Sequence, residues 1–114
     1  MSTEPIPAYV RLATFVWNHD GDTVTLALDH GRYPTSKSIT EVDLRIRNLW
    51  CPELSEAGGA EAAAFVRATM LAAKRIVAQT YKGSFARTVA DVWVDGQSLA
   101  ELVVAAGHGK VSRT

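Results

Sequence analysis

The sequence has only one cysteine, Cys51, among its 114 residues. A single cysteine excludes an internal disulfide and any zinc cluster built on several cysteines, and it fits a reducing compartment. The chain also lacks any run approaching the roughly 20 apolar residues of a membrane span. Its N-terminus has no basic segment followed by an apolar one, which a secretion signal requires. We therefore expect a cytoplasmic protein without a membrane partner.

Net charge is lacking as well, because 12 basic residues balance 12 acidic ones. The overall field of the protein then supplies no attraction for phosphate, so any contact with nucleic acid must be local. A hydrophobic content of 47% is enough for one compact domain with a core. We expect a flexible N-terminal segment at residues 1–7, a single domain at 8–111 and a C-terminal tail at 112–114. A monomer is the default oligomeric state.

Three strands are predicted in the first half of the chain. Residues 8–17 are rich in Val, Phe, Tyr and Trp and lead into a turn of Asx and Gly residues at 18–22. From Thr23 onward, apolar residues recur at every second position, which is the period of a half-buried strand. After a loop at 30–38, a third strand alternates apolar Val42, Leu44 and Ile46 with charged residues.

The second half predicts a helix, two strands and a further helix. Residues 60–75 are strong helix formers with apolar side chains at helical spacing, and residues 76–81 and 89–94 are β-branched and aromatic. Ser98 and Glu101 have the spacing of a capping box for a last helix, which Gly107 ends. Five short strands with an inserted helix predict an OB-type Greek-key barrel with two α-helices, a mainly β (α+β) fold that often binds oligonucleotides.

Three short motifs resemble the staphylococcal-nuclease-like (thermonuclease) family. The turn from Asp20 to Val24 reads Asp-Gly-Asp-Thr-Val, like the first signature of that family. Arg45 on the third strand, followed by Pro52-Glu53, is similar to the family's Arg, Asp, Pro-Glu stretch. The segment from Ser84 to Arg87 stands where the family has an aromatic residue, a glycine and an arginine. The similarity runs from about Val10 to Val111 and implies a calcium-assisted endonuclease that acts on DNA and RNA.

The resemblance also implies roles for individual residues. Glu53 would be the general base that activates a water, and Asp22 would bind the metal ion, since hard cations prefer carboxylate oxygens. Arg45 and Arg87 would hold the phosphate through the planar guanidinium, which suits bidentate contact. The alternative for each is an ordinary solvated side chain. For Asp20, hydrogen bonding within the turn is the preferred interpretation.

Three positions depart from the family pattern. Trp50 stands where the family has a second metal-binding aspartate, Cys51 replaces a small residue that offers a backbone oxygen, and Ala86 replaces a glycine. Trp50 either stacks against a base of the substrate or covers the end of the barrel, and we favour the cover because large aromatic side chains are usually mostly buried. Calcium binding is then expected to be weak, with other divalent ions left open.

Two rival functions follow from these departures. The first is a catalytically inactive OB module that binds nucleic acid or a protein partner, favoured by the missing aspartate and the zero net charge. The second is a purely structural OB module within a larger assembly. The three histidines, His19, His30 and His108, are too widely separated to predict a zinc site.

Overall fold

A computed structural model describes residues 10–29, 39–81 and 88–112 of the chain. The predicted N-terminal segment at 1–7 and most of the predicted tail at 112–114 lie outside the described residues. The elements in chain order are β1 (Val10–Asn18), β2 (Thr23–Asp29), β3 (Ile39–Ile46), β4 (Leu49–Trp50), α1 (Gly59–Ala72), β5 (Ile76–Tyr81), β6 (Thr88–Val94), β7 (Gln97–Ser98), α2 (Leu99–Ala105) and β8 (Lys110–Val111).

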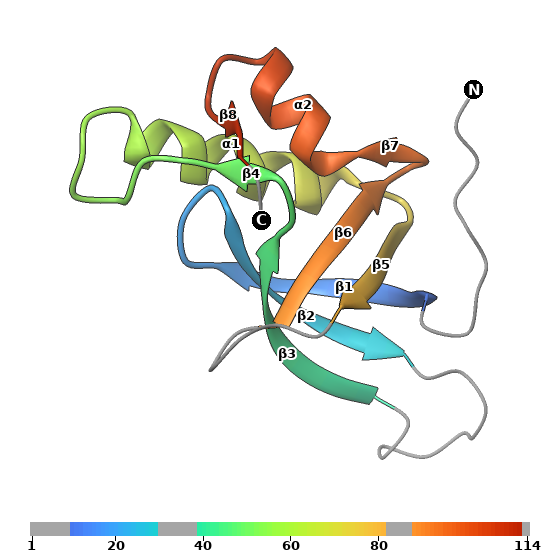
Figure 1. The fold of residues 1–114 in the computed structure, drawn as a ribbon. Coiled ribbons are helices and arrows are strands. Elements are labelled where there is room, and N and C mark those ends of the chain that lie inside the picture. Colours follow the sequence, from blue (N-terminus) through green and yellow to red (C-terminus); the bar gives the residue numbers. More distant parts are fainter. Residues whose placement is uncertain (1–9, 30–38, 82–87, 113–114) are drawn as a thin grey trace.

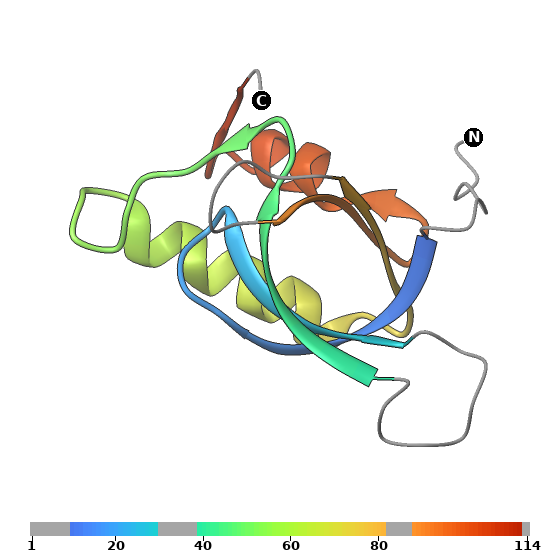
Figure 2. The same ribbon diagram turned by 60° about the horizontal axis from the view of Figure 1, so that its bottom comes forward.

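Five long strands form a closed barrel, as predicted. The sheet order is β3-β2-β1-β5-β6-β7, and a parallel pairing between β3 and β6 closes the ring. All other neighbours in this sheet are antiparallel. Figure 2 shows the barrel close to end-on, with the strands surrounding a central space that side chains fill. The mainly β fold with two helices is consistent with an OB-type barrel.

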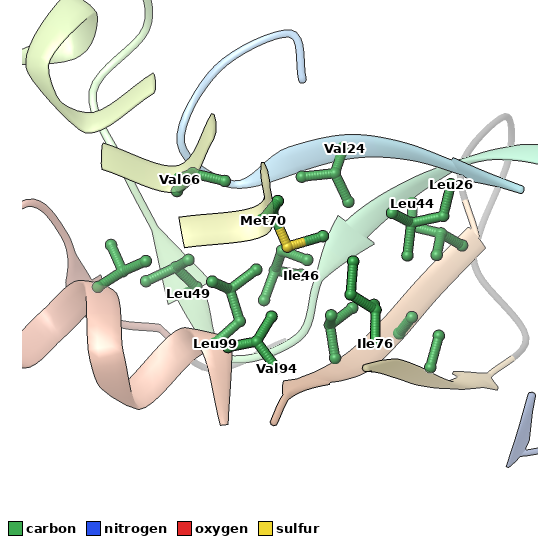
Figure 3. Packing of buried hydrophobic residues seen from close by; sticks show 14 of the residues in the cluster. Val24, Leu26, Leu44, Ile46, Leu49, Val66, Met70, Ile76, Val94 and Leu99 are labelled. Carbon is green, nitrogen blue, oxygen red and sulfur yellow. The ribbon is translucent and has the colours of Figure 1, made fainter. Parts of the chain in front are cut away.

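The core joins the inner face of the barrel to both helices. Leu26 and Leu44 fill the barrel interior, Met70 extends into it from α1, and Leu99 and Val103 come from α2. Figure 3 shows this side-chain packing. Each buried side chain of this size contributes about 1.5–3 kcal/mol through removal of apolar surface from water. Both helices are thereby held on one side of the barrel (Figure 1).

The short strands β4, β7 and β8 are not predicted by the sequence pattern. β4 and β8 form a separate two-stranded ladder, in which Leu49 pairs with Val111 and Trp50 with Lys110. This ladder lies on the same side of the barrel as the helices (Figure 1). It places Trp50 beside the C-terminal part of the chain, which matters for the site described below.

Helix α1 ends three residues earlier than predicted, at Ala72 rather than at residue 75. The carboxylate of Asp95 accepts hydrogen bonds from the backbone N–H groups of Lys74, at 3.0 Å, and Arg75, at 2.8 Å. These amides are therefore unable to continue the helical ladder. At α2 the prediction holds more closely, since the Ser98 hydroxyl accepts from the Glu101 N–H and Gly107 ends the helix with φ 82°. Neither helix in the described ranges is long and apolar enough to cross a membrane.

Candidate active site

The turn between β1 and β2 is anchored by a buried asparagine. Asn18 is only 1% exposed, and its side-chain amide donates to the carbonyl oxygens of Asp20, at 3.2 Å, and of Ala63 in α1, at 2.9 Å. Its own oxygen accepts from Nε of Arg67, at 3.2 Å. Within the turn, a carboxylate oxygen of Asp20 accepts from the N–H of Asp22, which is the turn role predicted for Asp20. The turn is therefore fixed against α1.

Asp22 points inward from this turn and is 5% exposed. One carboxylate oxygen accepts from the Cys51 backbone N–H at 3.0 Å, and the other from the Thr23 hydroxyl at 3.2 Å. Burial and the neighbouring Asp20 carboxyl raise the pKa of Asp22, and together they outweigh the lowering by the Cys51 N–H and by Arg45. Asp22 therefore ties the β1–β2 turn to the residues that follow β4.

Arg45 reaches the same place from β3. It pairs with Thr23 across the β2–β3 ladder, so its side chain leaves the barrel next to the β1–β2 turn. Its guanidinium lies 3.9 Å from the nearer Asp22 oxygen and remains partly exposed. A half-exposed arginine that is oriented by one carboxylate still has donors for an incoming anion.

The Pro52-Glu53 segment turns sharply before α1. The Glu56 side chain accepts from the Glu53 N–H at 2.8 Å, and the Glu56 N–H donates to the Glu53 carbonyl at 2.8 Å. A Cβ on Gly59 would lie 1.8 Å from that carbonyl oxygen, so only glycine allows the first turn of the helix to pass so close. These contacts fix the backbone of Glu53 while its side chain stays exposed.

Cys51 packs between two glycines from distant segments. A Cβ on Gly21 would lie 2.7 Å from its sulfur, and a Cβ on Gly109 would lie 2.9 Å from it. Burial, reinforced by the charges of Asp22 and Asp20, raises the pKa of the Cys51 thiol to about 12. The thiol is therefore a packing group and unsuited to act as a nucleophile.

Trp50, directly before this cysteine, is 40% exposed. The ring is therefore only partly buried, and both roles expected for it, a cover over the barrel end and a base-stacking surface, stay predictions. The ammonium of Lys110 lies 5.7 Å from the centre of the indole ring. Part of the ring is open to solvent, with a cation beside it.

These residues line one hollow of about 510 Å³. It brings together side chains from the β1–β2 turn, β3 and the segment after β4, namely His19, Asp20, Asp22, Arg45, Trp50, Cys51, Glu53, Leu54 and Ser55. Four of the predicted site residues, Asp22, Arg45, Trp50 and Glu53, are among them. Arg87, the second predicted phosphate contact, and Ala86 lie outside the described residues.

A second hollow, also of about 510 Å³, lies between β6 and α2. Its arginine, Arg47, forms a 3.1 Å ion pair with Asp91 and lies over the Tyr81 ring. The Tyr81 hydroxyl donates to the same aspartate at 2.8 Å. Because these charges already satisfy each other, the hollow around Asp22 and Arg45 is the better candidate for binding a charged substrate.

The residues around Asp22 do not form a calcium cage. Calcium takes six to eight oxygen ligands, several of them usually carboxylates, whereas the described part of the chain has no group of three acidic, histidine or cysteine side chains that could share an ion. Both oxygens of Asp22 already accept hydrogen bonds, and Arg45 supplies positive charge at the position where an ion would approach. Trp50 contributes no oxygen ligand.

Sequence reasoning missed Asn18 and Lys110. Asn18 contacts α1 residues that lie 45 or more positions away along the chain. Lys110 pairs with Trp50, which is also distant in the sequence. Asn18 reads as one more turn residue in the sequence, and Lys110 as a solvated charge.

The comparisons with known proteins do not identify a family. No protein-family model matches the chain, and no curated protein matches it. The candidate function therefore rests on the geometry and on the short motifs.

Proposed function

We propose that the chain is a nuclease of the staphylococcal-nuclease-like type that hydrolyses phosphodiester bonds in DNA or RNA. The observation that carries the proposal is the convergence of Asp22, Arg45 and Glu53 on one hollow from three separate segments. A general base and an oriented cation beside each other are what attack of water on a phosphate diester requires. The OB-type barrel that holds them is a common scaffold for nucleic-acid binding.

Each side chain has a defined part in the proposed reaction. The Glu53 carboxylate takes a proton from a water, whose oxygen forms a bond to phosphorus. The guanidinium of Arg45 donates to the phosphoryl oxygens as negative charge builds on them. The P–O ester bond then breaks, and the departing oxygen keeps the electron pair and takes a proton from solvent. Asp22 is the positioning residue that orients Arg45.

Cleavage of single-stranded DNA tests this proposal, measured in calcium, magnesium, manganese and chelator. Glu53→Gln removes the base and should lower turnover by about 10²- to 10⁴-fold with little change in binding. Glu61→Gln, which neutralises another exposed carboxylate in the first turn of α1, is the matched control and should cleave like wild type. Full activity in the Glu53 variant would mean that the base lies elsewhere.

Arg45→Lys is a second test of the same site. Lysine keeps the positive charge but loses the planar pair of donors, so turnover should fall much more than affinity. Arg75→Lys, at an exposed position before β5, controls for general effects of this exchange. Equal losses in the two variants would contradict the role of Arg45.

A nucleic-acid-binding module without hydrolytic activity is the second candidate function. The observation that favours it is the exposed indole of Trp50 in place of a carboxylate ligand. Binding of single-stranded DNA without cleavage under any of the metal conditions would select this candidate.

A further inference from the structure

Trp50 lines two hollows. The first hollow is the candidate active site, which Arg45 and Glu53 also line. Trp50 also lines a smaller hollow of about 270 Å³, together with Pro52, Gly58, His108 and Lys110 among others. Because Trp50 lines both, a ligand that crosses its indole would enter both hollows.

The smaller hollow has a basic rim. Lys110 is exposed, and no carboxylate among the described residues forms an ion pair with it. Its ammonium is kept near the indole by the β4–β8 pairing of Trp50 with Lys110. The ring of His108 packs 4.9 Å from the ring of Phe65, which fixes a second nitrogen-bearing side chain in the wall of this hollow.

The order of these groups matches the chemistry of a nucleic-acid strand. Arg45 offers donors for one phosphate, the indole offers a flat face for a base, and Lys110 offers a cation for a neighbouring phosphate. Aromatic side chains bind bases of single strands by stacking, with little dependence on sequence. In a double helix the faces of the bases are already stacked on one another, so they are closed to an indole.

We propose that Trp50 is a base-stacking platform and Lys110 a phosphate contact, and that the site therefore takes single-stranded nucleic acid across both hollows. This inference rests on the proposed nucleic-acid site but does not depend on hydrolysis. It replaces the role of a cover for the barrel end with a direct contact to the substrate.

Fluorescence anisotropy tests the proposal, with a labelled oligothymidylate of about ten nucleotides, a length within the range that one OB barrel binds. All variants carry Glu53→Gln so that cleavage does not interfere. Trp50→Leu should weaken binding by roughly 5- to 150-fold, the range expected for losing one stacked base, whereas Trp50→Phe should retain most of the affinity. Trp17→Leu is the matched control, since Trp17 is 50% exposed but lines neither hollow.

Salt dependence tests Lys110 separately. Each phosphate contact to a single strand contributes about −0.7 to the slope of log affinity against log salt concentration. Lys110→Gln should reduce the slope by about that amount. Lys74→Gln, an exposed lysine after α1, should leave it unchanged.

Three results would overturn the proposal: equal loss in the Trp50→Leu and Trp17→Leu variants, equal affinity for a duplex of the same length, or an acidic polypeptide that binds through Lys110 without needing Trp50. If binding depends on Trp50 but wild type cleaves no substrate, the stacking proposal is supported and the proposed hydrolysis is wrong. If wild type cleaves DNA but binding does not depend on Trp50, the proposed hydrolysis is supported and the stacking proposal is overturned.

Discussion

Asp22 holds its carboxylate in surroundings that oppose the negative charge. Burial raises its pKa above the ordinary value of 3.8, so the folded protein binds this proton more tightly than the unfolded chain does. Its contribution to the free energy of unfolding is fully present below pH 3.8 and is lost as pH rises through the folded pKa. Asp22→Asn should remove this pH-dependent loss, as measured by urea unfolding from acid to neutral pH in chelator.

The comparison uses the difference in unfolding free energy between wild type and variant at each pH. The free energy of unfolding of wild type should rise relative to that of the variant as pH falls. Asp29→Asn, an exposed aspartate at the end of β2, is the control for removing a carboxylate. Parallel pH profiles for wild type and Asp22→Asn would contradict a raised pKa at this position.

Trp50 is one of the features that keep the site from forming a calcium cage, together with Arg45 and the hydrogen bonds that Asp22 accepts. With one buried aspartate and no carboxylate at position 50, wild type should bind calcium only in the millimolar range, on the order of the weakest extracellular sites. Trp50→Asp adds an oxygen ligand and a negative charge and should tighten calcium by about tenfold or more, measured by calorimetry. The partial exposure of Trp50 means that its removal leaves space open to water rather than a closed core cavity.

Trp50→Asn is the matched control for that change. It supplies an oxygen of similar size without the charge, so its gain in calcium affinity should be smaller. A melting curve confirms that each variant is folded. A folded Trp50→Asp protein with unchanged calcium affinity would mean that position 50 does not face the ion site.

At the scale of residues, the sequence predicts the candidate site residues that lie within short local motifs. The Asp20 to Val24 turn, Arg45 and Pro52-Glu53 are readable because each lies within a few residues of its own signature. Asn18 is not readable, since its role depends on a carbonyl in α1 that only the folded chain brings within 2.9 Å. The exposure of Trp50 is likewise set by its pairing with β8.

At the scale of elements, Asp95 connects the end of α1 to the β6–β7 turn. Its carboxylate accepts from two backbone N–H groups, and its φ of 50° is a conformation that aspartate and asparagine tolerate better than alanine. Asp95→Ala should lower the free energy of unfolding by about 1–2 kcal/mol, at the lower end for bonds to a charged group because the site is exposed. Urea denaturation followed by tryptophan fluorescence measures the change.

Asp95→Asn separates the contribution of the charged hydrogen-bond acceptor from that of the backbone conformation with positive φ. It keeps the favourable φ and one acceptor oxygen, so it should lose less stability than alanine. If both variants unfold like wild type, Asp95 is not what ends the helix. The early end of α1 was unpredictable from helix propensity because the competing acceptor lies about twenty residues further along the chain, whereas the local capping pattern of Ser98 and Glu101 predicted α2 correctly.

At the scale of the whole molecule, Cys51 reports on global opening. Cys51 is only 3% exposed and its sulfur packs against Gly21 from the β1–β2 turn and Gly109 before β8, so we expect these segments to separate before a reagent reaches it. With a pKa of about 12, the thiolate fraction at pH 8 is on the order of one in ten thousand. Alkylation by iodoacetamide, followed by mass spectrometry, should therefore be slow and give an opening free energy equal to that of global unfolding.

Labelling in urea provides the rate for the exposed thiol. Addition of a mild concentration of denaturant should accelerate labelling in step with the global transition. Alkylation of the native protein at nearly the unfolded rate, with the far-UV circular dichroism unchanged, would show that the segments around Cys51 open locally.

The barrel as a whole was predictable because each long strand has its own signal. The alternation of Val24, Leu26 and Leu28 places one face of β2 in the core, and the structure buries all three. The β4–β8 ladder was not predictable, since two residue pairs are too few to produce a period.

The parallel pairing of β3 and β6 has a consequence for how the protein folds. Leu44 and Thr88 are partners at this closure, although α1 and β5 lie between them in the chain, and pairings between such distant residues form slowly because a long loop must first close. Until then the outer edges of β3 and β6 are unpaired and can bind the edges of other chains. We therefore expect the tendency to aggregate to be greatest in the refolding chain and to fall once Leu44–Ile46 pair with β6.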